Sequence, residues 1–140
     1  MDTITATVLG ARHLRTARNG QDAAAAASGP GWAAAAVCDG CSAGACSEVG
    51  ARLGAAIVVA ALARRLAQRE HGAGPDAGDP GHVELWSAVQ AELIGALSAL
   101  ADRMGPDRVQ SVVDHFLFTI VAVVATREAT SVWAIGDGAY

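Results

Sequence analysis

Three aspartates that stand beside glycines are the residues of this chain whose types and spacing best suit chemistry. They lie in Asn19-Gly20-Gln21-Asp22, in Val37-Cys38-Asp39-Gly40 and in Ile135-Gly136-Asp137-Gly138. Each carboxylate stands where an apolar, strand-like stretch begins or ends, and each glycine lets backbone and ligands approach closely. Carboxylates that converge from strand ends suit hard divalent cations such as Mg²⁺ and Mn²⁺, which prefer oxygen ligands.

Taken alone, each motif also has an ordinary structural explanation. Asp39-Gly40 is a common turn dipeptide, and the segment that ends at Asp22 would suit any surface turn. Asp137 is more informative, because acidic residues seldom follow a buried apolar strand without a purpose. In Asp39-Gly40, a carboxylate and an adjacent bare carbonyl could supply two metal oxygens from one turn.

The composition excludes several classes of function. A chain of 140 residues, 52% hydrophobic and 17% charged, suits one domain with a buried core. The net charge of −4, without any lysine, argues against a nucleic-acid partner. The longest apolar run, Ala55 to Ala63, is far shorter than the ~20 residues of a membrane helix, and no signal peptide is visible. We therefore expect a cytoplasmic protein with neither a nucleic-acid nor a membrane partner.

The three cysteines, Cys38, Cys41 and Cys46, form a C-x₂-C-x₄-C run. An odd, tightly clustered set is a poor disulfide framework, which again favours a reducing cytoplasm. A small cysteine-based metal-binding protein is a weak alternative, because a fourth cysteine is absent. Packing of small, buried thiols is the preferred explanation.

Strands are predicted in the first part of the chain. Thr3 to Arg12 alternates small, β-branched and apolar residues and predicts a first strand. The alanine runs Ala23–Ala27 and Ala33–Ala36 have helix propensity, but they are too short to nucleate helices alone. The break Ser28-Gly29-Pro30-Gly31 between them is typical of a hairpin, so we predict two neighbouring antiparallel strands.

Two helices and two further strands are predicted after the hairpin. The apolar spacing predicts helices from Ser47 to Glu70 and from about His82 to Met104, joined by a loop rich in glycine and proline. Phe116 to Ala125 is almost wholly apolar and predicts a strand buried on both faces. Ser131 to Ile135 predicts a last strand.

Taken together, the motifs resemble the PPM-type (PP2C-like) family of metal-dependent serine/threonine protein phosphatases, in its bacterial subfamily. The residues that carry the resemblance are Gly10-Ala11-Arg12-His13, Gly20-Gln21-Asp22-Ala23, Val37-Cys38-Asp39-Gly40, Ser47-Glu48-Val49-Gly50, Phe118-Thr119-Ile120 and Ile135-Gly136-Asp137-Gly138. The resemblance implies an α+β fold, the αββα sandwich of stacked antiparallel sheets flanked by helices. Residues 1–140 would be the N-terminal portion of one such domain, and thus a truncated sandwich.

The resemblance also implies a site and a reaction. Asp22 contributes to the metal site, Asp39 bridges two Mg²⁺ or Mn²⁺ ions, and the carbonyl of Gly40 binds one of them. Asp137 would hold an additional, weaker metal, and these groups would meet at one end of the strands. Either Arg18 or Arg15 would grip phosphate. The substrate would be a phosphoprotein, whose phosphoserine or phosphothreonine is hydrolysed by a metal-activated water.

Departures from the family pattern leave alternatives open. The position where many members carry a general-acid histidine holds Cys41, and His13 is a second candidate near the site. Because further metal carboxylates of the family lie later in the domain, the chain could instead be a catalytically incomplete fragment that acts as a binding or regulatory module. Strand edges left exposed in such a fragment would favour self-association.

Overall fold

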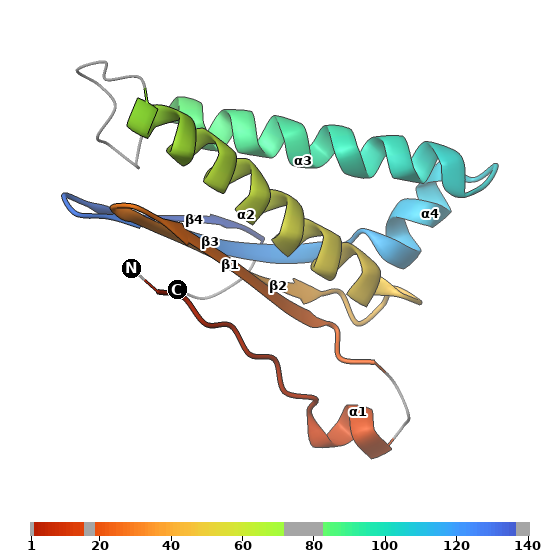
Figure 1. The fold of residues 1–140 in the computed structure, drawn as a ribbon. Helices are drawn as coiled ribbons and strands as arrows, with labels where there is room; N and C mark the ends of the chain where they lie inside the picture. The colour runs from red at the N-terminus through yellow and green to blue at the C-terminus, as the bar shows by residue number, and fades with distance from the viewer. Residues whose placement is uncertain (1, 16–18, 72–82, 137–140) are drawn as a thin grey trace.

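The computed structural model describes residues 2–15, 19–71 and 83–136, and within them four strands form one antiparallel sheet in the order β1-β2-β3-β4 (Figure 1). Helices α2 and α3 cover one face of this sheet, and the N-terminal segment with α1 lies on the other side. This α+β arrangement is compatible with the predicted fold. A second sheet does not occur among the described residues. The elements are α1 (Ala11–Arg15), β1 (Asp22–Gly29), β2 (Trp32–Gly40), α2 (Ser47–His71), α3 (Val83–Met104), α4 (Arg108–His115), β3 (Phe118–Thr126) and β4 (Thr130–Ile135).

The two alanine runs form the hairpin β1–β2, as predicted. The strands pair antiparallel from Asp22 opposite Asp39 to Gly29 opposite Trp32. Pro30 and Gly31 connect them, and the φ of +81° at Gly31 suits the third position of a type II turn after proline. Strand pairing and packing against α2 outweigh the weak helix propensity of alanine.

The two long helices also occur where the sequence predicts them and build the core with the sheet. The largest fully buried side chains include Leu62 and Val58 of α2 and Val89 of α3. Trp86 of α3 stacks on Trp133 of β4, with ring centroids 5.0 Å apart. This stack holds α3 over β4, the last strand in the order of the sheet.

By length and composition alone, α3 is apolar enough to cross a membrane, with a mean hydropathy of 1.2 in its most apolar window. Its residues Leu85, Trp86, Val89 and Leu93 are buried in the core, however. A core helix passes the same test, so the absence of a membrane partner remains a prediction.

The predicted first strand, Thr3 to Arg12, is wrong. Residues 3–10 have no regular secondary structure, and Ala11–Arg15 form the short helix α1. Ile4 and Val8 are 95% and 89% exposed. An alternating pattern makes a strand only where a neighbour supplies hydrogen bonds and an apolar face, and β1 ends the described sheet on this side.

The prediction for Phe116 to Ala125 also needs correction. The strand β3 begins at Phe118, and the helix α4 precedes it. Asp107 starts α4, because its side chain accepts a hydrogen bond from the backbone N–H of Gln110 at 2.9 Å. Only one face of β3 is buried, since residues 120, 122 and 124 face the helices while 121 and 123 are half-buried on the other face.

Candidate metal-binding site

The register of the sheet brings two of the predicted metal ligands together. Ala23, Cys38 and Ile120 form one row across β1, β2 and β3, and all three are buried beneath the helices. Successive residues of a strand point to opposite faces. The next row, Asp22, Asp39 and Thr119, therefore faces away from α2, and both carboxylates are exposed.

Asp22 and Asp39 are directly opposite each other in the β1–β2 ladder. Such a pair places the Cβ atoms about 4.5–5.5 Å apart. Asp137 lies outside the described residues. A Cβ on Gly136, the residue before it, would come within 2.6 Å of Thr119 Cγ2, so the chain before Asp137 runs beside the same row.

The turn after Asp39 is held tightly. The backbone N–H of Gly40 donates to the carbonyl oxygen of Gln21 at 3.1 Å, and that of Cys41 donates to Leu117 at 2.9 Å. A Cβ on Gly40 would lie 2.8 Å from Ser47 Oγ and 2.9 Å from Gln21 O. Glycine is therefore required for close packing, and its carbonyl remains a predicted metal ligand.

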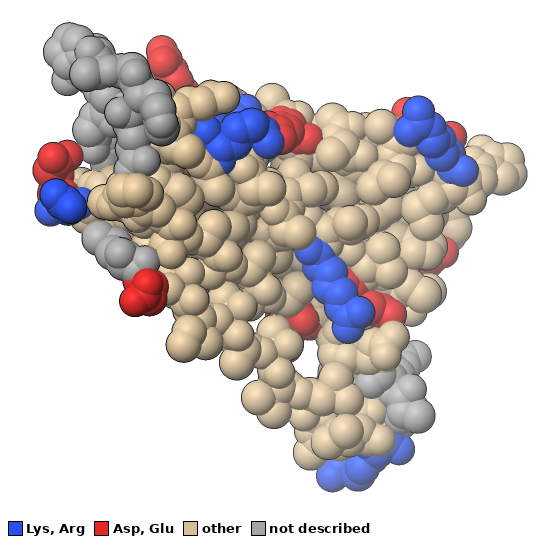
Figure 2. Space-filling model, in the orientation of Figure 1, with Lys and Arg blue, Asp and Glu red and all other residues tan. Residues whose placement is uncertain are grey.

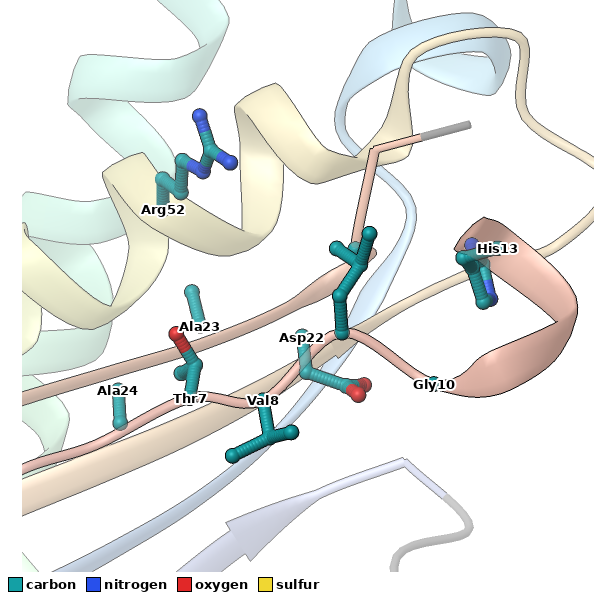
Figure 3. A pocket seen from close by; sticks show the side chains of 10 residues that line it. Thr7, Val8, Gly10, His13, Asp22, Ala23, Ala24 and Arg52 are labelled. Atoms are coloured by element: carbon teal, nitrogen blue, oxygen red, sulfur yellow. The ribbon is translucent and has the colours of Figure 1, made fainter. Parts of the chain in front are cut away.

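Each carboxylate of this pair lines an open cavity. One of about 430 Å³ is lined by Asp39, Gly40, Cys41 and Thr119, together with Gln21, Ser42, Leu117 and Phe118. The other, of about 650 Å³, contains Asp22, His13 and Arg52 (Figure 3). Asp22 points away from α2 in this view, and the Arg52 guanidinium does not point at its carboxylate.

The predicted phosphate-binding arginines are not brought to the pair by the part of the chain that the structure describes. Arg18 lies outside the described residues, and Arg15 is exposed on α1 and does not line the cavity of Asp22. Arg52, to which no sequence motif points, does line that cavity. The only sequence feature that marks Arg52 is its position about one turn after the start of α2. On the face in Figure 2, charged side chains form small separate groups on a largely uncharged surface.

Hydrogen bonds tie the segment before Asp22 to the start of α2. His13 Nδ1 is 2.9 Å from the carbonyl oxygen of Asn19, and Asn19 Nδ2 donates to Glu48 Oε1 at 3.1 Å. This bond from Asn19 holds the pKa of Glu48 below its ordinary value, since it favours the carboxylate form. His13 thus has a structural contact and also lines the cavity of Asp22.

The cysteine cluster gains no support as a metal site. Burial raises the pKa of the Cys38 thiol to about 12, so its thiolate is scarce at neutral pH. All three cysteines are free thiols. Among the described residues, no group of three or more His, Cys, Asp and Glu side chains could hold a metal ion.

The donors near Asp39 fit one hard cation and not, by themselves, two. Two carboxylates and a glycine carbonyl are oxygen donors, and Mg²⁺ typically keeps several waters beside one or two carboxylates. Such a set leaves coordination positions open. It lacks the further carboxylates that a second ion would need, within the ranges 2–15, 19–71 and 83–136.

The molecule is thus an α+β domain that carries an acidic pair at the strand ends of a sheet covered by helices on one face. A family model described as protein phosphatase 2C matches residues 9–140, and the chain therefore belongs to the protein phosphatase 2C family. The family is generally dependent on Mg²⁺ or Mn²⁺ and acts on phosphoproteins. No curated protein and no solved structure matches the chain significantly. The bacterial subfamily stays a prediction.

Proposed function

We propose that the chain takes part in metal-dependent hydrolysis of phosphoserine and phosphothreonine in proteins, with Mg²⁺ or Mn²⁺ as the cofactor. The observation that carries this proposal is the pairing of Asp22 with Asp39 on the exposed face of the β1–β2 ladder. Like charges directly opposite each other destabilise a sheet. A divalent cation between them turns this repulsion into attraction, which gives the arrangement a purpose.

In this proposal Asp22, Asp39 and the carbonyl of Gly40 hold the cation, and Asp137 contributes to an additional site. The bound ion lowers the pKa of water and neutralises charge on the phosphoryl oxygens. Arg15 or Arg18 would bind the substrate phosphate. Cys41 stands at the general-acid position and lines the cavity of Asp39, but a thiol is a poor proton donor to a leaving alkoxide.

A binding or regulatory module without turnover is the second candidate. It is favoured by the small number of metal donors in the described residues, where two carboxylates balance the charge of one divalent ion. This second candidate predicts that a polypeptide of residues 1–140 binds Mn²⁺ but hydrolyses phosphate esters slowly or not at all.

The two candidates are separated by measuring binding and turnover on the same protein. Mn²⁺ binding is followed by calorimetry, and phosphate release from p-nitrophenyl phosphate and from a phosphothreonine peptide is followed at millimolar Mn²⁺. Asp39→Asn should abolish both signals. Asp102→Asn is the matched control, because Asp102 is an exposed carboxylate on α3.

Release of phosphate that needs Mn²⁺ and is lost in Asp39→Asn would support the hydrolase. Binding without release would support the module. Absence of Mn²⁺ binding in the wild-type protein would contradict both.

A further inference from the structure

The residue before Asp22 is bonded to the residues after Asp39. The Gln21 carbonyl oxygen accepts from Gly40 N–H at 3.1 Å, and Gln21 Nε2 donates to the Cys41 carbonyl oxygen at 3.2 Å. Gln21 thus holds both sides of the Asp39-Gly40-Cys41 turn, one from its backbone and one from its side chain. Each of the paired carboxylates is adjacent, along its own strand, to this contact.

The same amide also reaches the start of α2. Gln21 Nε2 donates to Ser47 Oγ at 2.9 Å, and Ser47 is fully buried. A carboxamide nitrogen carries two N–H groups, and both are used here. The orientation of the amide follows from chemistry, because the Cys41 carbonyl can only accept and therefore requires the nitrogen to face it.

Close packing around Gly40 leaves the turn little freedom as long as Gln21 is in place. The space for a Cβ at this position is already filled by Ser47 Oγ and the Gln21 carbonyl oxygen. Without the amide, the carbonyl of Cys41 and the hydroxyl of Ser47 would both lose a partner. The turn that carries Asp39 and Gly40 could then shift relative to Asp22.

We propose that Gln21 is a positioning residue, which fixes the Asp39-Gly40 turn against Asp22 and α2 and so sets the affinity of the site for a divalent cation. The inference rests on the proposed metal site. Partners that orient metal ligands typically contribute 10–100-fold in metal affinity. Because Gln21 acts as a hydrogen-bond donor, a carboxylate in its place should weaken binding despite its added negative charge.

The test measures Mn²⁺ dissociation constants by calorimetry for the full chain, at a temperature where each variant is shown to be folded by circular dichroism. Gln21→Met keeps the side-chain length and removes both donors, and Gln21→Glu replaces them with acceptors. Each should bind Mn²⁺ at least about 10-fold more weakly than wild type. Gln90→Met, an exposed position on α3, is the matched control and should bind as wild type does.

A merely structural role for Gln21 would lower the unfolding temperature and leave the dissociation constant of the folded protein unchanged. That result, or tighter binding by Gln21→Glu, would overturn the inference. If wild type itself binds no Mn²⁺, the proposed metal site fails, and the role of Gln21 with it. If wild type binds and the variants match it, only the inference fails.

Discussion

Asp22 and Asp39 repel each other whenever β1 and β2 are paired in this register. Unfolding separates the two strands, so the repulsion weakens the folded state more than the unfolded state. The paired carboxylates therefore lower the stability of the metal-free sheet and at the same time favour the binding of a cation. The substitution Asp39→Asn should therefore change the free energy of unfolding in opposite directions without and with bound cation.

We predict that Asp39→Asn raises the free energy of unfolding in the presence of a chelator, by a few tenths to about 1 kcal/mol. With saturating Mn²⁺ the order should reverse, since a ligand at 100 times its dissociation constant stabilises the wild-type fold by about 2.7 kcal/mol. Urea unfolding with chelator and with Mn²⁺ measures the change in the free energy of unfolding under each condition. A variant less stable than wild type in chelator would contradict the repulsion.

Gly40→Ala should be strongly destabilising, by about 1–3 kcal/mol, because backbone and a buried hydroxyl already occupy the space of the new methyl group. Gly95→Ala is the matched control. Nothing lies within 4 Å of a Cβ at Gly95, so alanine there should stabilise α3 by about 0.5–1 kcal/mol. Thermal or urea unfolding measures the stability of both variants. Equal effects of the two substitutions would contradict the prediction that close packing at Gly40 excludes a Cβ.

At the residue scale, the sequence predicts the two strands whose pairing sets Asp22 opposite Asp39, through the Gly-Pro-Gly break between the alanine runs. It does not predict the bonds of Gln21, because these depend on how the 40–46 turn returns to α2. Arg52 was missed for the same reason, since its neighbours come from a segment distant in the chain.

At the scale of the elements, one glutamate joins the two long helices. Glu92 of α3 accepts from Arg64 at 2.5 Å and 2.7 Å and from Arg65 at 2.8 Å, both on α2. Hydrogen bonds from Arg64, followed by those from Arg65, hold the pKa of Glu92 below its ordinary value. The group is partly exposed, so its contribution is modest.

Glu92→Gln should lower the free energy of unfolding near about pH 7 by up to about 1 kcal/mol. A carboxyl group with a lowered pKa stabilises the fold above its unfolded-state pKa, and this stabilisation is lost as the pH falls through the folded-state value. The difference between wild type and variant should therefore shrink as the pH is lowered from about 7 to about 3. Urea unfolding at both pH values measures it, and a pH-independent difference would exclude the ion pair as its cause.

The elements that the sequence predicts well are those whose signals are local. Ser47 and the apolar spacing define α2, and Gly105-Pro106 ends α3. The helix α4 is a short segment directly before the apolar, β-branched run of β3, and Asp107 after a proline is its main sequence signal. The segment Thr3 to Arg12 has the pattern of a strand, but a strand also needs a neighbour, which no local pattern can reveal.

At the scale of the whole molecule, the face of the sheet opposite the helices is largely apolar, apart from its aspartates and a few hydroxyl side chains. Its side chains include Ala24, Ala26, Ala35, Val37, Val121, Val123, Val132 and Ala134. Val37 and Val132 are 55% and 53% exposed. An apolar sheet face with an unpaired edge strand favours association.

We therefore predict that the 140-residue polypeptide self-associates with rising concentration, and that Val132→Lys on β4 weakens this association. A lysine on an edge strand is a common barrier to edge pairing. Val109→Lys is the control, because Val109 is 73% exposed but lies on α4. Sedimentation velocity over a concentration series measures the effect, and equal association of both variants would show that another surface is responsible.

The register of the β1–β2 hairpin determines which residues of the two strands lie opposite each other. Most of its paired side chains are alanine, so sliding one strand by two residues would keep every side chain on its own face and change the packing little. The turn at Pro30-Gly31 opposes this slip from the far end of the hairpin, where the Trp32 ring lies against Gly29. The alignment of Asp22 with Asp39 thus depends not only on the bonds of Gln21 but also on a turn roughly 23 Å away, at about 3.3 Å per residue pair. A change in the turn would misplace charges that it never touches.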